Sequence, residues 1–146
     1  MAYRVLNSRD AFWRPSNLMK VENTNLAMQL GAETLGFRLW RLRPGQASTW
    51  HKHLDELEIY LVLEGTGRMR VEDESLTLER LSAVLVEPES MRQVFNDTEE
   101  DALWLVAGAP PEGAKILAMD EQELEQIYPD GPKALPPELG GGQLDS

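Results

Sequence analysis

The chain has 146 residues, of which 42% are hydrophobic, and it carries a net charge of −11 at pH 7. This length and composition fit a single globular domain with its own hydrophobic core. A strongly acidic surface repels the phosphate backbone of nucleic acids and the anionic face of a membrane, so we expect neither as a partner. Cysteine is absent, which excludes disulfides, thiolate metal sites and a thiol nucleophile.

Residues 1–35 are predicted to form an N-terminal arm whose short strands, over residues 3–6, 18–22 and 25–30, join a barrel. The arm lacks the apolar core of about 7–15 residues that a signal peptide needs, and no run of the chain approaches the length of a membrane span. The lack of cysteine is compatible with a reducing compartment. We therefore expect a cytoplasmic protein.

Residues 36–109 are predicted to form the barrel core. Short strand-like segments separated by turn residues fill this stretch, with alternating apolar and polar residues over 36–43 and 68–72, and the middle of the chain shows no helical periodicity. Besides the stretch around the two histidines, we expect strands over residues 36–43, 68–72, 76–79, 82–86, 93–96 and 102–106. Many short strands with turns between them are typical of a β-sandwich or a small barrel.

Residues 110–146 contain a short predicted helix and a tail. Asp120 is the expected N-cap, with Glu123 three residues later as in a capping box, and Pro129 ends the helix. From Pro129 onward the chain is rich in proline and glycine, and such a composition buries little apolar surface. The sequence leaves two alternatives for this tail, packing on the barrel through Leu135 or a loose end.

The strongest chemical signal is a cluster of possible metal ligands. His51 and His53 are the two histidines of the chain, and their spacing places both side chains on one face of an extended strand. Glu58 follows five residues later, at the head of an apolar run. Two imidazoles and a carboxylate can hold a divalent transition metal such as Fe, Mn, Ni or Zn. The alternative, for any His-x-His pair, is a solvated strand end without a metal.

Glycines extend the pattern on both sides of this cluster. The order Gly45-x5-His51-x-His53-x4-Glu58-x6-Gly65 resembles the first signature motif of the cupin superfamily at every fixed position. In cupins the two histidines and the glutamate of this motif are metal ligands. A fourth ligand histidine comes from a second motif, Gly-x5-Pro-x-Gly-x2-His-x3-Asn. The resemblance implies an all-β fold, the cupin double-stranded β-helix or jelly-roll barrel, followed here by the short C-terminal helix and the Pro/Gly-rich tail.

The second motif is degraded in this chain. Its best match keeps Pro88, has Ser82 and Ser90 in place of the glycines, and has Asp97 at the asparagine position. Gln93 falls at the position of the fourth ligand, and a neutral amide oxygen is a weaker ligand than an imidazole for such metals. The site is therefore an open three-ligand centre, a weak four-ligand centre or empty. The residues that the resemblance assigns to it are His51, His53, Glu58 and Gln93.

Strand alternation divides the residues after the histidines between two faces. If Glu58 points into a barrel, Tyr60 and Val62 do too. The alternate residues then point outward and must be buried by a second layer or a partner subunit; they are Leu57, Ile59, Leu61 and Leu63. Cupins commonly dimerise through such faces, so the resemblance implies a homodimer. Asp55 and Glu56 are expected to be exposed loop acids.

The substrate pocket is expected to take a small molecule. An inward arginine in a barrel favours an anionic ligand such as a carboxylate. The candidate pocket residues are Tyr60, Arg38, Trp40, Arg70 and Phe95.

Two functions of different classes follow, with a weaker third. The first is a metal-dependent enzyme of dioxygenase or isomerase type, acting on a small polar or anionic metabolite. The second is a non-catalytic binding or sensing module with weak or no metal, favoured by the missing fourth histidine. The third is a metal-free acid–base isomerase, which needs a His–Asp pair, whereas both histidines already fit ligand positions. The sequence identifies neither the substrate nor the metal.

Overall fold

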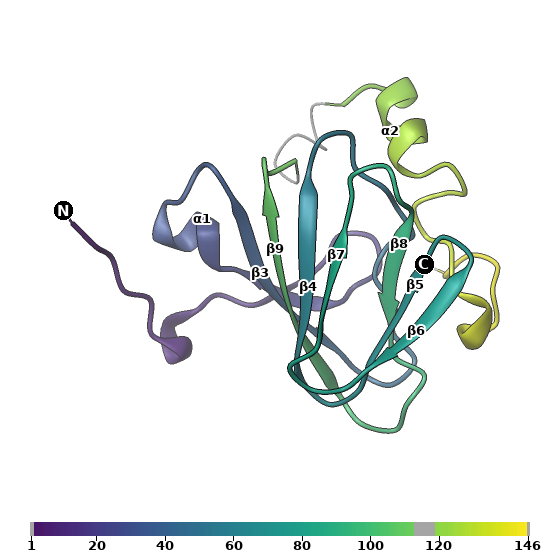
Figure 1. Ribbon diagram of the computed structural model, residues 1–146, viewed down its shortest axis with the longest axis horizontal. Helices are drawn as coiled ribbons and strands as arrows, with labels where there is room; N and C mark the ends of the chain where they lie inside the picture. The colour runs from purple at the N-terminus through teal and green to yellow at the C-terminus, as the bar shows by residue number, and fades with distance from the viewer. Residues whose placement is uncertain (1, 113–118, 146) are drawn as a thin grey trace.

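In the computed structural model, residues 2–112 and 119–145 are described, and they form two antiparallel sheets (Figure 1). The larger sheet has the strand order β1-β2-β3-β9-β4-β7 and the smaller one β6-β5-β8. The strands of the larger sheet are β1 (Arg14–Pro15), β2 (Glu22–Asn25), β3 (Gly36–Leu42), β9 (Ala102–Ala109), β4 (Leu57–Glu64) and β7 (Ala83–Val86). Those of the smaller sheet are β6 (Glu74–Leu78), β5 (Gly67–Val71) and β8 (Arg92–Phe95).

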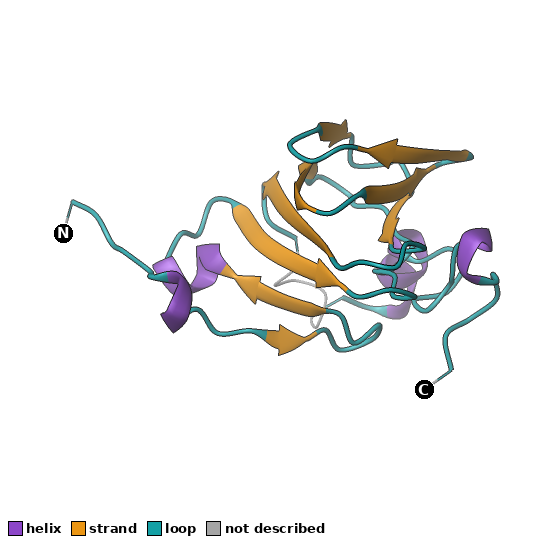
Figure 2. Cartoon of the chain, turned by 90° about the horizontal axis from the view of Figure 1, so that it is seen from below, coloured by secondary structure: helices purple, strands orange, loops and turns teal. Residues whose placement is uncertain are grey.

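The two sheets form two layers (Figure 2) that share one hydrophobic core. Val62 and Trp104 from the larger sheet and Met69 and Val94 from the smaller sheet belong to the same buried cluster. Burial alternates along β4, as expected for a strand with one face on the core. The prediction of an all-β fold is therefore confirmed, and its strands over residues 36–109 lie within a few residues of the predicted ranges.

The register around β9 sets up the inward row on which the site is built. Val106 lies opposite Arg38 on one side and opposite Tyr60 on the other. Two pairs further along, Gly108 lies opposite Glu58. Because residues directly opposite each other share a face, Glu58, Tyr60 and Arg38 all belong to the inner face of the larger sheet.

The N-terminal arm differs from its predicted strands. Residues 3–6 extend away from the sheets without regular structure, followed by a short 3-10 turn, η1 (Ser8–Asp10). The segment expected to be a strand over residues 25–30 is the helix α1 (Leu26–Leu30). The Asn25 side chain caps it by accepting a hydrogen bond from the amide of Met28 at 3.0 Å, a contact that favours a helix start over a continuing strand.

The C-terminal segment follows its prediction more closely. The helix α2 (Glu121–Ile127) begins where expected, and the Asp120 side chain accepts a hydrogen bond from the amide of Glu123 at 2.8 Å. The tail packs on the barrel, through Leu135 as well as Leu139 and Leu144, and contains a second 3-10 turn, η3 (Pro137–Leu139). Of the two alternatives for the tail, the packed one is correct for the described residues.

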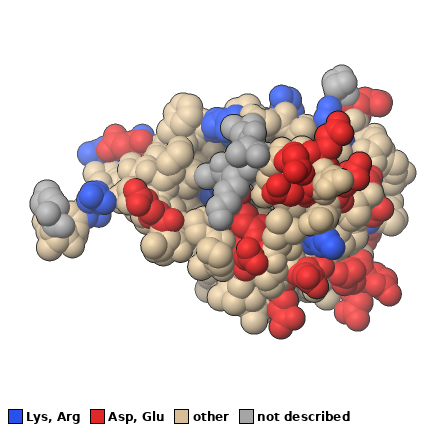
Figure 3. Space-filling model, turned by 90° about the horizontal axis from the view of Figure 1, so that it is seen from above, with Lys and Arg blue, Asp and Glu red and all other residues tan. Residues whose placement is uncertain are grey.

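The surface agrees with the composition. Acidic side chains outnumber basic ones on the face that Figure 3 shows, as expected from the net charge of −11. Within the described ranges, no helix has both the length and the apolar character that crossing a membrane requires.

Candidate metal centre

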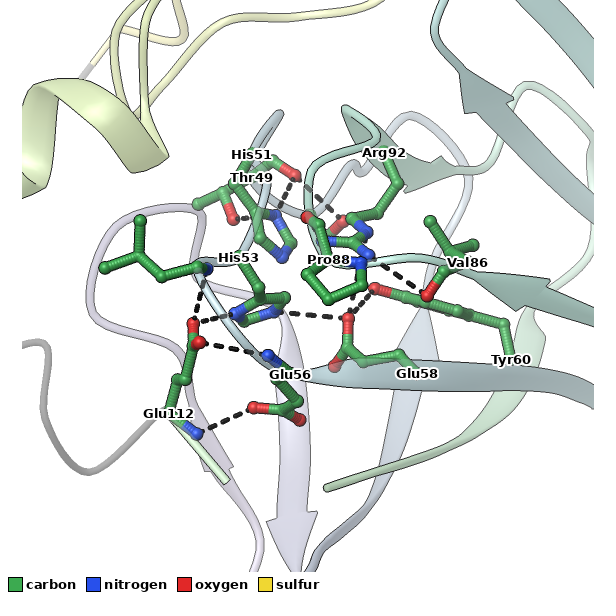
Figure 4. Close-up of polar contacts among 12 residues, drawn as sticks. Thr49, His51, His53, Glu56, Glu58, Tyr60, Val86, Pro88, Arg92 and Glu112 are labelled. Carbon is green, nitrogen blue, oxygen red and sulfur yellow. Dashed lines mark hydrogen bonds and ion pairs between the residues drawn. The ribbon is translucent and has the colours of Figure 1, made fainter. Parts of the chain in front are cut away.

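The structure brings His51, His53 and Glu58 together (Figure 4). Each offers a ligand atom, and these atoms lie within 4.8 Å of one another. Glu58 is on β4, while His51 lies on the preceding segment, which pairs with the start of β8 through reciprocal backbone hydrogen bonds of 3.0 and 2.8 Å between His51 and Arg92. The three side chains therefore come from two neighbouring backbone segments that the sheet register fixes.

Both imidazole rings are oriented through their Nδ1 atoms. Nδ1 of His51 lies 3.0 Å from the backbone oxygen of Thr49 and 3.0 Å from its hydroxyl. Nδ1 of His53 lies 2.9 Å from a carboxylate oxygen of Glu112. Because carbonyl and carboxylate oxygens accept hydrogen bonds, each Nδ1 is the donor, and each Nε2 is left for the centre of the cluster. Metal-binding histidines show this arrangement, with the second ring nitrogen donating to a carbonyl or a carboxylate.

Glu112 connects His53 to the loop before β4. Its carboxylate also accepts hydrogen bonds from the amides of Leu54 and Glu56, both at 3.0 Å, and from the amide of Asp55. Burial raises the pKa of Glu112, but these backbone donors and His53 outweigh burial and lower it. Glu112 could not be predicted as part of the site, because an acid in a Pro/Gly-rich segment more than 50 residues away carries no local signal.

The protonation states suit a metal. Burial raises the pKa of Glu58, but the hydrogen bond and charge of His53 outweigh burial and lower it to about 2. Burial and the neighbouring His53 lower the pKa of His51 to about 4. For His53, burial lowers the pKa, but the hydrogen bond and charge of Glu58 raise it overall. At neutral pH Glu58 is thus anionic and His51 neutral, as metal ligands must be, and the raised pKa of His53 means that a metal competes with a proton for this ring.

Glu56 is buried and not the exposed acid that the sequence predicted. Only 5% of its surface is exposed, and one of its carboxylate oxygens accepts a hydrogen bond from the amide of Glu112 at 2.7 Å. The other oxygen occupies the place that a Cβ atom would need at Gly108. A side chain at position 108 would therefore exclude the Glu56 carboxylate from this pocket, which is a pairing that no local pattern reveals.

Arg92 is the second residue that the sequence analysis missed. Its side chain is fully buried, and because Arg92 pairs with His51, it enters the same side of the barrel. Its Nε lies 3.9 Å from the Glu58 carboxylate. Asn96, four residues after Arg92, is also fully buried. Arg92 and Asn96 therefore have the spacing of the histidine and asparagine in the second motif, if the segment after Pro88 is one residue shorter than in that motif.

Gln93 is not part of the cluster, which corrects its prediction as the fourth ligand. Its amide nitrogen donates to the backbone oxygens of Ser48 and Ala134 at 2.6 and 2.8 Å, and its amide oxygen accepts from Arg70 at 2.7 Å. Successive residues of a strand face opposite sides of the sheet. If the second motif is aligned one residue earlier, Arg92 takes the ligand position and faces the cluster, whereas Gln93 faces the other side of β8.

The pocket candidates divide between the same two sides. Tyr60, Arg38 and Trp40 belong to the inner face, and the Tyr60 hydroxyl donates to Glu58 at 2.7 Å. Arg70 and Phe95 do not belong to it, which corrects their prediction as pocket residues. Arg70 donates to Gln93, and its guanidinium carbon lies 3.8 Å from the centroid of the Trp50 ring. Phe95 is two residues after Gln93 on β8, so it faces the same side as Gln93, and its ring lies under the Arg68 guanidinium.

Fold and site together define a small β-barrel domain whose inner face carries a His/His/Glu cluster suited to a metal. The family model described as the cupin domain matches residues 38–108. The chain therefore contains a cupin domain and belongs to the cupin superfamily, as the motif predicted.

Solved structures agree with this assignment. The chain is similar to a sugar phosphate isomerase of the cupin superfamily from Silicibacter pomeroyi, with a TM-score of 0.67, 20% identity and coverage of 74% of this chain and 76% of that chain. It is similar to a predicted oxalate decarboxylase from Thermotoga maritima, with a TM-score of 0.65, 22% identity and coverage of 74% and 100%. A cupin protein from Bacteroides fragilis gives a TM-score of 0.63, 17% identity and coverage of 77% and 88%. At these identities the likeness establishes the fold. A search of curated proteins gives no significant match.

Proposed function

We propose that this chain is a metal-dependent cupin enzyme that acts on a small anionic metabolite. The observation that carries the proposal is the orientation of the two imidazoles. Both Nδ1 atoms are engaged, by Thr49 and by Glu112, so both Nε2 atoms are available where they meet the Glu58 carboxylate. A solvated strand end would need neither the burial of His53 and Glu58 nor a buried carboxylate behind His53.

The residues present fit a divalent transition metal such as Fe, Mn, Ni or Zn. His51, His53 and Glu58 would hold it through two nitrogens and one oxygen, and the bound ion would supply Lewis-acid chemistry at its open positions. Tyr60 fixes the orientation of the Glu58 carboxylate through its hydroxyl. His51 is the one member of this trio that is partly exposed, so a substrate approaches from its side.

An anionic substrate is supported by the charges on the inner face. Arg92 is buried beside Glu58, and Arg38 belongs to the same face of the larger sheet. Two of the similar structures are named for enzymes of anionic compounds, a sugar phosphate and oxalate. The two reaction types in question, isomerase and dioxygenase, are distinguished by whether turnover requires O₂.

Elemental analysis of protein purified without a histidine tag tests the proposal. We expect close to one equivalent of transition metal per chain after reconstitution, and loss of that metal in the His51→Ala/His53→Ala double variant. Asp55→Asn, which changes an exposed acid next to the site, is the matched control and keeps the metal. Stoichiometric metal in the double variant would rule out these ligands, and wild-type protein that takes up no metal would refute the metal centre.

The second candidate, a binding or sensing cupin, is favoured by one specific observation. Arg92 already supplies a buried cation next to Glu58, so the site can hold an anion without a metal. Stable binding of a small acid without turnover, in the presence of O₂ and added metal, would favour this function over catalysis.

We also propose a homodimer. Supporting this, Leu57, Ile59 and Leu85 are 42%, 48% and 59% exposed, and they lie on the outer face of the adjacent strands β4 and β7. A contiguous apolar sheet face of this kind is typical of a surface that a partner covers.

A further inference from the structure

We propose that Arg92 is the docking group for a carboxylate of the substrate, which it binds through its Nε–H beside the open positions of the metal centre. The inference rests on the proposed metal centre and adds the class of substrate, a small carboxylate. It assigns to Arg92 a role in binding and specificity.

The first support is the way in which the Arg92 side chain is anchored. Its Nη2 donates to the backbone oxygens of Glu87 and Val86 at 2.8 and 3.4 Å, and its Nη1 donates to that of Pro88 at 3.3 Å. All of these acceptors are neutral carbonyl groups, so they fix the plane of the guanidinium without neutralising its charge. A preorganised guanidinium loses little conformational entropy when it binds an anion.

The second support is the Nε atom of the same guanidinium. Nε of Arg92 is buried and has no hydrogen-bond partner among the described residues. The Glu58 carboxylate is 3.9 Å away, beyond hydrogen-bond distance. A buried N–H of a charged group without an acceptor is costly, and such groups in native structures call for an explanation such as a ligand. The free N–H lies beside Glu58, so a ligand that accepts from it is also placed next to the metal ligands.

The chemistry of the site selects a carboxylate. A cation would be repelled by the guanidinium, and a neutral ligand would accept from its Nε–H less strongly than an anion does. Arginine recognises phosphate through several parallel N–H donors, but three of the four terminal N–H groups of Arg92 already donate to carbonyls. A carboxylate needs one oxygen for the free N–H and has a second oxygen for an open position of the metal.

The size of the ligand is limited by the surroundings of the site. His53, Glu58 and Tyr60 are buried, whereas part of His51 is exposed. On the His51 side, the ring of Tyr128 lies 6.3 Å from the His51 ring, centroid to centroid. Access from this one side, next to an aromatic ring, suits a compact acid such as oxalate better than an extended one.

The test compares the affinities of Co²⁺-loaded proteins for oxalate and for imidazole, followed by visible absorption. Imidazole is the reference ligand because it binds a metal without carrying a negative charge. We expect Arg92→Met to bind Co²⁺ with unchanged stoichiometry, to bind imidazole as the wild type does, and to bind oxalate about 10- to 100-fold more weakly, as for a lost hydrogen bond to a charged group. Arg70→Met is the matched control, since Arg70 faces the other side of β8, and its oxalate affinity stays at the wild-type value.

A second variant keeps the test decisive if Arg92→Met does not fold. Arg92→His places a possible metal ligand beside His51, so we expect tighter Co²⁺ binding together with weaker oxalate binding. Equal oxalate affinity in wild type and in a folded, metal-loaded Arg92 variant would overturn the inference and leave the metal centre standing. Equal losses for oxalate and imidazole would also overturn it, because they would show a structural role only. Failure of the wild type to bind Co²⁺ would refute the metal centre itself, and the inference with it.

Discussion

The contact between Glu112 and His53 gives the sharpest prediction, because a single atom can be changed there. In Glu112→Gln one oxygen becomes an NH₂ group, which faces either the amides of Asp55 and Glu56 or the amide of Leu54 together with His53 Nδ1. Donors then face each other in both orientations. When the NH₂ group lies on the His53 side, the conflict with this ring is relieved if His53 accepts at Nδ1 and carries its hydrogen on Nε2, which is the atom that a metal needs.

The expected loss follows from this geometry. Removing the partner of a metal-binding histidine typically lowers metal affinity about 10- to 100-fold, or roughly 1.4–2.8 kcal/mol. Removing charge from a group that accepts several backbone hydrogen bonds costs about 1–3 kcal/mol of folding stability in addition. We therefore expect Glu112→Gln to fold with a lower melting temperature and to bind Co²⁺ or Zn²⁺ at least tenfold more weakly, as measured by competition with a chromophoric chelator.

Glu99→Gln is the matched control, because it makes the same chemical change at an exposed acid. We expect Glu99→Gln to keep the melting temperature and the metal affinity of the wild type. If Glu112→Gln is folded and binds metal as tightly as the wild type, Glu112 does not orient a metal ligand, and the main support for the metal centre is lost.

Three further predictions follow from the packing and the charges. Because the folded-state pKa of Glu58 is about 2, below its ordinary value of 4.5, the metal-free protein loses stability as the pH falls from 4.5 toward 2, and Glu58→Gln flattens that part of the curve in denaturation measured by circular dichroism. Gly108→Ala places a methyl group against the Glu56 carboxylate, and we expect a loss of about 1–3 kcal/mol in urea denaturation; unchanged stability would mean that Glu56 can leave its pocket at no cost. Ile59→Glu/Leu85→Glu converts the proposed dimer to a monomer in analytical ultracentrifugation, and a monomeric wild type would show that the dimer proposal is wrong.

The fold could be predicted well from the sequence where local patterns and tertiary structure agree. The alternation over residues 36–43 and the apolar run over residues 102–106 match the paired strands β3 and β9, and the capping box at Asp120 starts a helix as expected. The N-terminal arm was predicted less well. Residues 25–30 have no pattern that separates a strand from a short helix, and the outcome depends on a capping contact at Asn25.

The candidate site could be predicted where its residues are close in sequence. His51 and His53 are two residues apart, so spacing alone indicates that they share a face, and the motif spacing adds Glu58, which lies five residues further on. Glu112 approaches His53 from after β9, and only tertiary structure brings the two together. Gln93 was misassigned for a different reason, since in a strand an error of one residue exchanges the two faces.

The charges around the cluster explain why a metal and an anion belong together at this site. Glu58 and Glu112 are anionic, because both have lowered pKa values, and Arg92 is a buried cation beside them. Despite burial, the pKa of His53 is raised by the hydrogen bond and charge of Glu58, so a proton on His53 competes with a metal for this place. A divalent ion that displaces this proton adds two charges where one was removed, so loading makes the site more positive by one charge. Because an uncompensated buried charge is costly, the loaded site favours a ligand that brings negative charge, such as a carboxylate at Arg92.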